Sequence, residues 1–329
     1  MQFRFLRMSL GLILALAAQA ALAQEPPSIP KVLKELKLGR NNTDKLVNKG
    51  EFAQKLDPKK PVLVSHCDNF VNEVVNASLF DPNSKAGARF ADECMRDWSP
   101  VLAATTVDGF EKSLASVLGL LVNEKGAAFC TAFRVSQTWV ATARHCYFER
   151  ATGSPLRTIA TTQFRMAGRA TDYAIAELSC GAQPCTDKAA ITSFSTLGDV
   201  LLLKVPRLAD VPLPKIRFET DFRLGDQVVL IGASPEFGRA NALLSDADPK
   251  GCTVAKREAD CLFHNCNSGG GYSGAPIIRP ALTDSGALSI LGIHIEGVDT
   301  DGTQCRAPSL QGYGNVALAI NDQFRGVHP

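Results

Sequence analysis

From about residue 106 to the end, the chain consists of short apolar runs that are separated by turns. Many short strands with turn signals between them are typical of an all-β barrel or sandwich. A Pro-spaced stretch at 209–216 lies near the middle of these runs and predicts a linker between two β halves. The runs that we expect to form strands are SVLGLLV, AAFCTAFRV, WVATA, RTIATTQFRM, YAIAELSC, DVLLLKV, QVVLIGA, CLFHNC, APIIRP, LSILGIHI and NVALAI.

The composition indicates a globular chain and narrows its partners. Hydrophobic residues make up 45% of the 329 residues and charged residues 21%, which excludes a disordered, collagen-like or coiled-coil protein. The formal net charge is only +2, so bulk charge does not favour binding to nucleic acid. This length leaves room for one large domain or two modest ones.

The amino terminus has the pattern of an export signal. Arg4 and Arg7 precede the apolar run LGLILALAAQAALA, which ends with small residues at Ala21 and Ala23. The run is shorter than the roughly 20 apolar residues that a membrane span needs, and no later run is long enough either. We therefore expect residues 1–23 to be removed, the protein to be secreted or periplasmic, and no membrane partner.

The region between the signal and the β-rich part predicts a small, partly helical module. Its first part, up to about residue 60, is rich in Lys and Arg and reads as a solvated leader. The chain has ten cysteines and no C-x-x-C motif, which favours disulfides in an exported protein over a zinc site. Cys67 and Cys94 are the only cysteines before residue 130, so we expect them to pair. Residues 24–105 are then either a removable propeptide or a retained accessory module.

Two segments carry residues that are suited to catalysis. TWVATARHC places His145 at the end of an apolar strand, directly before Cys146. NSGGGYSGAPI places Ser273 between glycines, in a loop whose backbone N–H groups can converge on one point. Each signal is weak alone, because a single histidine is more often structural and an isolated G-x-S-G is more often a turn.

Taken in order along two β halves, a histidine, an aspartate and a serine resemble the chymotrypsin-like serine proteases. The family's boxes are matched by ATARHC, GDVLLLKV, GYSGAPI and GIHIEG. The resemblance runs from about residue 106 to the end, so it implies a protease domain at 106–329 behind the module at 24–105. It also implies an all-β fold of two six-stranded antiparallel β-barrels, with the small N-terminal module added.

The resemblance implies a secreted serine endopeptidase that hydrolyses peptide bonds through an acyl-enzyme intermediate. Ser273 is the nucleophile, His145 the general base, and Asp199 the carboxylate that orients the imidazole. The N–H groups of Gly271 and Ser273 form the oxyanion hole. We expect protein or peptide substrates, no cofactor and no metal. The alternative is a non-catalytic protein of the same fold that binds peptides or partners, although such proteins usually lose one of the three residues.

Two aspartates compete for the third position. Asp172 in DYAIAEL and Asp199 in DVLLLKV both resemble the family's box. The family fold needs two strands between the histidine and the aspartate. RTIATTQFRM and YAIAELSC supply these strands before Asp199, whereas Asp172 follows only one, so we choose Asp199.

The chain departs from the animal digestive members of the family. Arg144 replaces an alanine, and Tyr272 replaces the aspartate that receives a freed N-terminal amine. Activation by that ion pair is therefore excluded, and the sequence looks closer to the bacterial, glutamyl-endopeptidase-like branch. We expect the full-length exported protein to be a zymogen or a slow enzyme that is matured by cleavage somewhere between about Trp98 and Ser116. The competing view is that the N-terminal module is permanent.

Three residues bear on specificity for the substrate residue before the cleaved bond, P1. Asn267 stands where trypsin-like enzymes carry an aspartate, so basic P1 residues are not expected. Ser268 and His294 could donate hydrogen bonds to a glutamate, as the resemblance to glutamyl endopeptidases implies. The alternative is a pocket for small or apolar residues, because Glu296 would repel an acidic substrate if it pointed inward.

The resemblance also implies a disulfide between Cys130 and Cys146 beside the histidine. Cys180 and Cys185 can close the turn CGAQPC. The remaining four cysteines allow three pairings, and the sequence does not choose between them. These four are Cys252, Cys261, Cys266 and Cys305.

Overall fold

The computed structural model describes most of the β-rich region and a short stretch before it. The expected signal peptide, the basic leader and Cys67 lie outside the described residues. Among the described residues, no helix combines the length and hydropathy needed to cross a membrane. The described residues are 92, 94–104, 109–169, 171–181, 185–233, 235, 239, 241–247, 252–297, 305 and 315–320.

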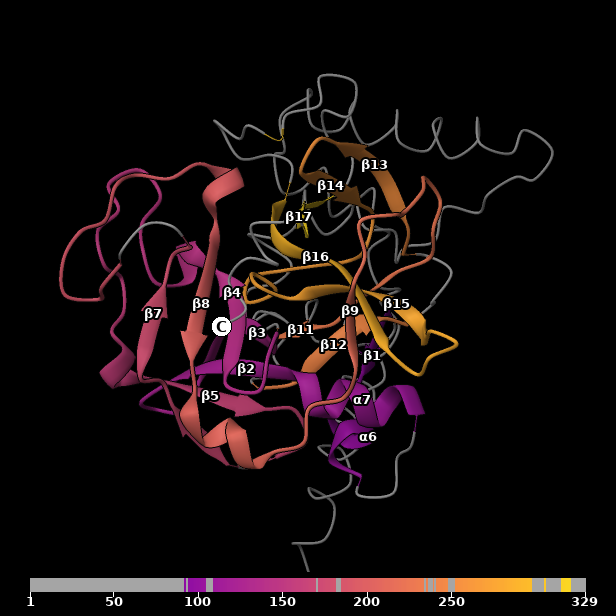
Figure 1. The fold of residues 1–329 in the computed structure, drawn as a ribbon, viewed down its shortest axis with the longest axis horizontal. Coiled ribbons are helices and arrows are strands. Elements are labelled where there is room, and N and C mark those ends of the chain that lie inside the picture. The colour runs from indigo at the N-terminus through magenta and orange to yellow at the C-terminus, as the bar shows by residue number, and fades with distance from the viewer. Residues whose placement is uncertain are drawn as a thin grey trace, which may run out of the picture. The chain divides into compact units, whose positions relative to one another are not determined.

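The first sheet contains seven strands in the order β6-β5-β2-β3-β4-β8-β7, all of them antiparallel (Figure 1). Its central strands are apolar on both faces because the sheet curls around its own core, and every residue of β4 is buried. The strands are β2 (Leu118–Asn123), β3 (Ala128–Arg134), β4 (Trp139–Ala143), β5 (Thr162–Met166), β6 (Asp172–Ala174), β7 (Glu177–Ser179) and β8 (Val200–Lys204).

The second sheet also has seven strands, in the order β10-β15-β16-β17-β14-β13 with β9 paired to β16. The pairing of β9 with β16 is parallel, whereas the others are antiparallel. The strands are β9 (Ile216–Phe218), β10 (Val229–Leu230), β13 (Val254–Glu258), β14 (Cys261–His264), β15 (Pro276–Leu282), β16 (Leu288–Gly297) and β17 (Asn315–Ala319).

A three-stranded sheet, β1-β12-β11, continues the second β half. β10 and β11 come from the same apolar run, and Ile231, which belongs to neither strand, separates them. The all-β fold with two curled antiparallel sheets is therefore confirmed, while the division into strands differs from two sets of six. The strands of this sheet are β1 (Met95–Asp97), β11 (Gly232–Ala233) and β12 (Leu243–Asp246).

The segment before the first sheet packs into the same core as the strands. β1 pairs with β12, and the indole of buried Trp98 donates a hydrogen bond of 2.8 Å to Ser245 Oγ. Two helices follow, α6 (Ser99–Ala103) and α7 (Gly109–Val117). Leu102 and Leu114 are buried in the main hydrophobic cluster. The helical character expected before residue 106 is thus present in the described part of that region.

A buried arginine ties this segment to the linker between the two β halves. Arg134, at the end of β3, is fully buried, and its two terminal nitrogens donate hydrogen bonds to five carbonyl oxygens of described residues. Desolvation lowers the pKa of Arg134 to about 10. The five carbonyls belong to Ser116, Gln137, Leu208, Val211 and Pro212.

Four disulfides join described cysteines. Cys130–Cys146 and Cys180–Cys185 form as expected. The structure also selects one of the open pairings, Cys252–Cys266 with Cys261–Cys305. The expected bridge from Cys94 involves Cys67 and so falls outside the described residues.

Candidate active site

Strand pairing places His145 beside Asp199. His145 lies in a 3-10 turn, Arg144–Cys146, that begins where β4 ends. β4 pairs with β8 so that Ala143 faces Val200, the residue after Asp199. The disulfide to Cys130 on β3 then fixes the same turn from the other side. The local sequence therefore determines where the imidazole and the carboxylate meet.

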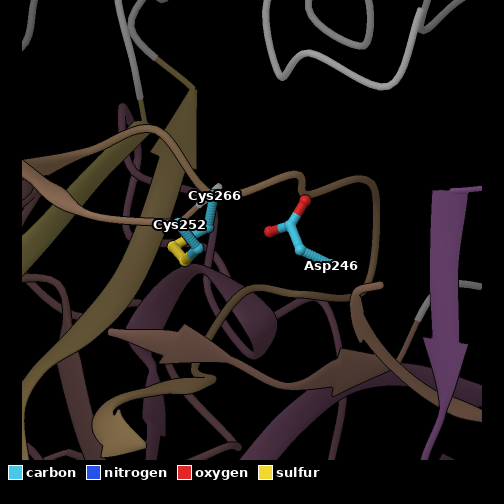
Figure 2. Close-up of side chains that lie close together, drawn as sticks. All are labelled: Asp246, Cys252 and Cys266. Carbon is cyan, nitrogen blue, oxygen red and sulfur yellow. A yellow bond between two sulfur atoms is a disulfide. The ribbon is translucent and has the colours of Figure 1, made fainter. Parts of the chain in front are cut away.

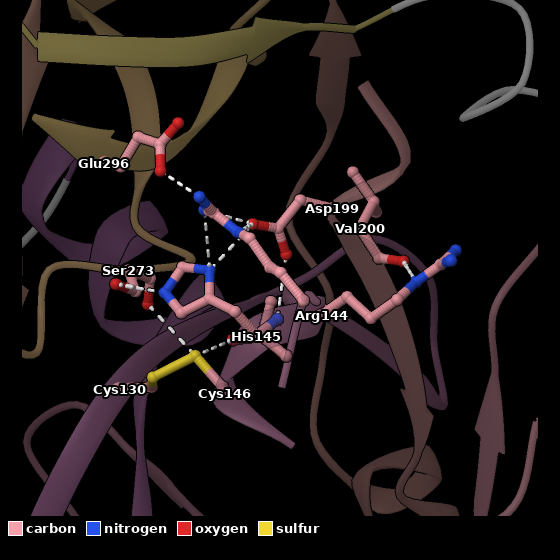
Figure 3. Close-up of polar contacts among 10 residues, drawn as sticks. Cys130, Arg144, His145, Cys146, Asp199, Val200, Ser273 and Glu296 are labelled. Carbon is pink, nitrogen blue, oxygen red and sulfur yellow. Dashed lines mark hydrogen bonds and ion pairs between the residues drawn. A yellow bond between two sulfur atoms is a disulfide. The ribbon is translucent and has the colours of Figure 1, made fainter. Parts of the chain in front are cut away.

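The imidazole of His145 contacts a carboxylate on one side and a hydroxyl on the other (Figure 3). Its Nδ1 lies 2.7 Å from Asp199 Oδ2, and its Nε2 lies 2.7 Å from Ser273 Oγ. The backbone N–H of His145 donates to Asp199 Oδ1 at 2.8 Å. Since a carboxylate only accepts, Nδ1 carries the proton and Nε2 is free to accept from the serine hydroxyl.

Asp199 is ionised although it is completely buried. Burial alone raises the pKa of this carboxyl, but the charge and hydrogen bonds of His145 and the charge of Arg150 outweigh it and hold the pKa below its ordinary value. A buried carboxylate that is fully hydrogen-bonded keeps its charge in place. The arrangement can therefore orient the imidazole and stabilise it when it gains a proton.

The loop that bears Ser273 is fixed to the first sheet by backbone contacts. Thr131 on β3 donates its N–H to Ser273 O at 3.0 Å and its hydroxyl to Gly271 O at 2.8 Å. Gly274 has a φ of +86°, and a Cβ at this position would lie 2.3 Å from Thr131 O and from Thr142 Oγ1. Only glycine permits both this conformation and this approach.

Two backbone N–H groups of the loop remain available. Within the described part of the chain, Gly271 N and Ser273 N donate no hydrogen bond, whereas Gly274 N donates to His294 O at 2.8 Å and Ala275 N to Tyr272 O at 2.8 Å. Gly271 has a φ of +98°, which an L side chain rarely adopts. The pair is therefore suited to receive an oxyanion next to Ser273.

The second candidate aspartate lies elsewhere. Asp172 on β6 forms a bidentate pair with Arg165, with Arg165 Nη2 at 2.7 Å from Asp172 Oδ2. Both side chains are partly exposed. Asp172 is thus engaged with Arg165, while Asp199 contacts His145.

The two departures from the digestive enzymes have structural roles. The buried Arg144 side chain turns away from His145 and donates to Val200 O and to Cys180 O, at 3.2 and 3.0 Å (Figure 3). Tyr272 is fully buried, and its hydroxyl donates to Leu244 O on β12 at 2.9 Å. Both residues therefore brace the strands that carry the site.

The expected specificity residues are buried, and Asn267 and His294 have different hydrogen-bond partners. Asn267 turns toward Asp246, which accepts from its backbone N–H at 3.0 Å and from its side-chain amide. Ser268 is buried next to it. His294 on β16 instead pairs with His264 on β14, with 3.1 Å between His294 Nδ1 and His264 Nε2.

The two histidines are neutral. Desolvation lowers the pKa of His264 to about 3, and desolvation, together with the unfavourable interaction that a protonated His294 would have with protonated His264 or His145, lowers the pKa of His294 well below its ordinary value. His264 Nδ1 is buried with no hydrogen-bond partner among the described residues. The pairing with His264 is absent from our sequence prediction, because it joins two strands that are not neighbours in sequence.

A cluster that could suggest a metal site does not offer metal ligands. Asp246, Cys252 and Cys266 lie within 4.8 Å of one another through their ligand atoms. Figure 2 shows the two sulfurs bonded to each other, and a disulfide offers no thiolate. Asp246 is meanwhile occupied by Asn267. This cluster is part of the framework behind the nucleophile loop.

Sequence reasoning missed an arginine at the site. Arg150, five residues after His145, donates from Nε and Nη2 to Asp199 Oδ2 at 2.8 and 2.5 Å. Its third nitrogen, Nη1, pairs with Glu296 on β16. Glu296 is therefore directed toward the site, and its charge is compensated there. The one feature of the sequence that could have indicated this role is that Arg150 follows the ATARHC segment closely.

The chain is similar to known peptidases. A family model described as the trypsin-like peptidase domain matches residues 130–282, a span that contains His145, Asp199 and Ser273. The solved structure of a Glu endopeptidase in complex with MPD is 15% identical and has a TM-score of 0.46. That similarity covers 71% of this chain and 94% of the endopeptidase chain. No curated protein sequence matches. With two curled antiparallel β sheets and this domain match, residues 130–282 of the chain are similar to a trypsin-like peptidase domain.

Proposed function

We propose that this protein is a serine endopeptidase that cleaves peptide bonds through an acyl-enzyme intermediate. The observation that supports this most strongly is the position of His145 between Asp199 and Ser273, with 2.7 Å on each side. Distances in this range permit proton transfer from the hydroxyl to the imidazole. The family match adds that proteins or peptides are the substrate class.

In the proposed reaction, His145 Nε2 takes the proton of Ser273 as its Oγ attacks the carbonyl carbon of the scissile bond. The N–H groups of Gly271 and Ser273 hold the oxyanion of the tetrahedral intermediate. The protonated imidazole then gives its proton to the leaving amine, and the acyl-enzyme forms. Water, activated by the same imidazole, releases the acid. Asp199 keeps Nδ1 protonated and stabilises the imidazolium throughout.

The test of the mechanism is covalent labelling. A fluorophosphonate should label the processed protein at Ser273, and Ser273→Ala should abolish labelling and hydrolysis. Ser285→Ala, at an exposed turn between β15 and β16, is a matched control that should label like the wild type. A processed wild-type protein that does not label would favour the alternative, a non-catalytic protein that binds peptides.

For specificity, we propose a preference for glutamate at P1. If His264 Nε2–H donates to His294 Nδ1, then His294 carries its proton on Nε2 and can donate it to a substrate oxygen. This tautomer leaves His264 Nδ1 as a buried acceptor and not as a buried donor. Glu296 offers little repulsion, because Arg150 neutralises it.

Cleavage of matched peptides with Glu, Gln, Leu or Arg at P1 tests this preference. We expect Glu to be turned over fastest and Arg slowest. Equal kcat/KM values for Glu and Gln would exclude recognition of the carboxylate, and preference for Leu would indicate the small or apolar pocket. None of these outcomes affects the serine mechanism.

We also propose that the protein is secreted or periplasmic, with residues 1–23 as its signal. The disulfides among the described cysteines fit an oxidising compartment. Maturation between Trp98 and Ser116 stays a prediction. A cut there would leave β1 held by its pairing with β12, so we propose that the piece carrying β1 remains bound.

Determination of the N-terminus of the secreted protein tests this proposal. Under reducing and denaturing conditions, a cut protein should give two fragments, which migrate as one species in native buffer. A single chain that begins at Gln24 and is fully active would show that processing is not required.

A further inference from the structure

The residues around Asp199 include a cation that the proposed reaction does not use. Arg150 donates two hydrogen bonds to Asp199 Oδ2, the same oxygen that faces His145 Nδ1. We propose that Arg150 is a positioning residue that fixes Asp199 and sets the lower pH limit of activity. In this proposal Glu296 offsets part of the positive charge of Arg150. This inference rests on the proposed serine protease function.

The geometry fixes the carboxylate at both of its oxygens. Asp199 Oδ1 accepts from the backbone N–H of His145, and Oδ2 accepts from the imidazole and from Arg150. The Asp199 side chain is 0% exposed, whereas that of Arg150 is 26% exposed. With these donors in place the carboxylate cannot rotate away from the imidazole, so Arg150 maintains the geometry that the reaction needs.

The same contact places a positive charge beside the imidazole. Arg150 Nη2 lies 3.2 Å from His145 Nδ1. Both nitrogens are donors when Nδ1–H faces the carboxylate, so this approach is not a hydrogen bond. The two groups share one acceptor oxygen, and the guanidinium opposes the positive charge that the imidazole gains on protonation. Arg150 thereby favours the neutral imidazole, which is the form that can act as a base.

Glu296 limits this effect and links the two β halves. It lies on β16 and is paired with Arg150 Nη1, and its side chain is only 7% exposed. A carboxylate on the far side of the guanidinium offsets part of its charge at the imidazole. Because Arg150 follows β4 and Glu296 belongs to the second sheet, the pair also holds the strand that carries His294 against the histidine turn.

The other charged groups near the imidazole do not replace Arg150. Arg144 points to Val200 O and Cys180 O. His294 is neutral, since burial lowers its pKa well below the ordinary value. Among the described residues, the charged groups that contact His145 are therefore Asp199 and Arg150, and Glu296 acts from behind Arg150.

The test is the pH profile of kcat/KM for three variants. Arg150→Met should move the acid limb upward by about one pH unit, which lowers kcat/KM about tenfold at pH values below the limb. Glu296→Gln should move the limb in the opposite direction, because it leaves Arg150 uncompensated. Arg150→Lys should keep the limb near its wild-type position but lower kcat, since an ammonium ion cannot donate in the two-pronged geometry.

Arg165→Met is the matched control. Arg165 also binds an aspartate in the first sheet with two nitrogens, but its partner Asp172 makes no contact with His145. Its profile should keep the wild-type midpoint. If Arg150→Met lowered kcat/KM equally at every pH, Arg150 would be merely structural and the proposal would be wrong.

Two further outcomes separate this inference from the proposed function. If the wild type labels with a fluorophosphonate but its profile superimposes on that of Arg150→Met, the inference fails and the function stands. If Ser273 of the wild type does not label, the function itself fails. If Arg150→Met does not fold, the other two variants decide the question. An acid limb of Glu296→Gln that lies at lower pH than the limb of Arg150→Lys would support the inference, and acid limbs at the same pH would contradict it.

Discussion

Two polar groups near the nucleophile loop are built in opposite ways. The first consists of Asp199, Arg150 and Glu296, which carry full charges and are joined by ion pairs. The second consists of His264 and His294, which are neutral because desolvation lowers both pKa values. The charged group is completely partnered, whereas the neutral pair keeps one buried nitrogen, His264 Nδ1, without a partner in the described residues.

The difference reflects what each group is proposed to do. The charged cluster acts on the imidazole in the same way for every substrate, so its charges are satisfied before any substrate binds. The histidine pair is proposed to meet a substrate side chain, and a free charge there would be costly to bury. In the proposed mechanism, the catalytic groups are thus arranged in advance, while the histidine pair gains a polar partner from the substrate.

Loss of the charge on Asp199 should give the largest effect. Asp199→Asn keeps the shape but favours the wrong imidazole tautomer, so kcat should fall about ten-thousand-fold. Asp172→Asn is the matched control and should leave kcat within about a factor of two, because Asp172 pairs only with Arg165 among the charged groups described. Steady-state kinetics on one peptide checks both variants. Normal activity of Asp199→Asn would contradict our assignment of the third residue.

Loss of the neutral pair should affect some substrates and spare others. His294→Ala should lower kcat/KM for a P1 Glu peptide by about tenfold to a hundredfold, the range of one hydrogen bond to a charged group. A P1 Leu peptide is the control and should change much less. A parallel fall for Glu, Gln and Leu would mean that His294 only supports the groove wall.

The pH dependence of stability should distinguish the neutral pair from the charged cluster. The pKa of His264 is about 3 in the folded protein and 6.5 in its ordinary state, so on acidification the unfolded chain binds the proton first. The stabilisation is complete above pH 6.5 and is lost as the pH falls toward 3. The free energy of unfolding should therefore fall by about 1.4 kcal/mol per pH unit for this group.

His264→Leu should remove that contribution and flatten the slope. Urea unfolding at several pH values between neutrality and pH 4 measures it, with the wild type in the same buffers as the reference. Parallel curves for the two proteins would show that His264 is protonated in the folded state and would contradict the description of a neutral pair.

The smallest effect is expected from a charged pair at the surface. Lys204 and Glu177 lie 3.2 Å apart with side chains 42% and 53% exposed. Lys204→Met should change the free energy of unfolding by less than about 0.5 kcal/mol, because solvent screens exposed pairs. If thermal or urea unfolding showed a loss above about 1 kcal/mol, burial would not explain why the exposed Lys204–Glu177 pair contributes less than the charged cluster around Asp199.

The sequence predicts the groups that short segments position and misses those that depend on distant segments. His145 and Ser273 lie next to recognisable strands, and the strand count selected Asp199, which contacts His145 in the structure. Arg150 and Glu296 meet only because two sheets come together, so no local pattern indicates their pairing. The assignment of Asn267 to the substrate pocket stays a prediction, and its contact with Asp246 on β12 was not indicated by the sequence.

The fold shows the same limit. The apolar runs predict an all-β chain, and the structure contains the two large sheets that these runs form. The boundary at residue 106 marks where the strand-like apolar runs begin in the sequence. β1 lies before this boundary, is only three residues long and pairs with the distant strand β12. A pattern of that length carries too little periodicity to be recognised. The burial of Arg134 could not be predicted from the sequence either, because its carbonyl partners come from α7, a turn and the linker.

The anchor at Tyr272 bears on when the protein becomes active. Its hydroxyl binds Leu244 O, and burial raises its pKa well above the ordinary value, so the anchor is uncharged. The nucleophile loop can therefore take its shape as the chain folds, with no need for a newly created chain end. Formation of the loop then follows folding, whether or not the chain is cut between Trp98 and Ser116, and an added amino-terminal tag should not disturb the loop as long as β1 still reaches β12.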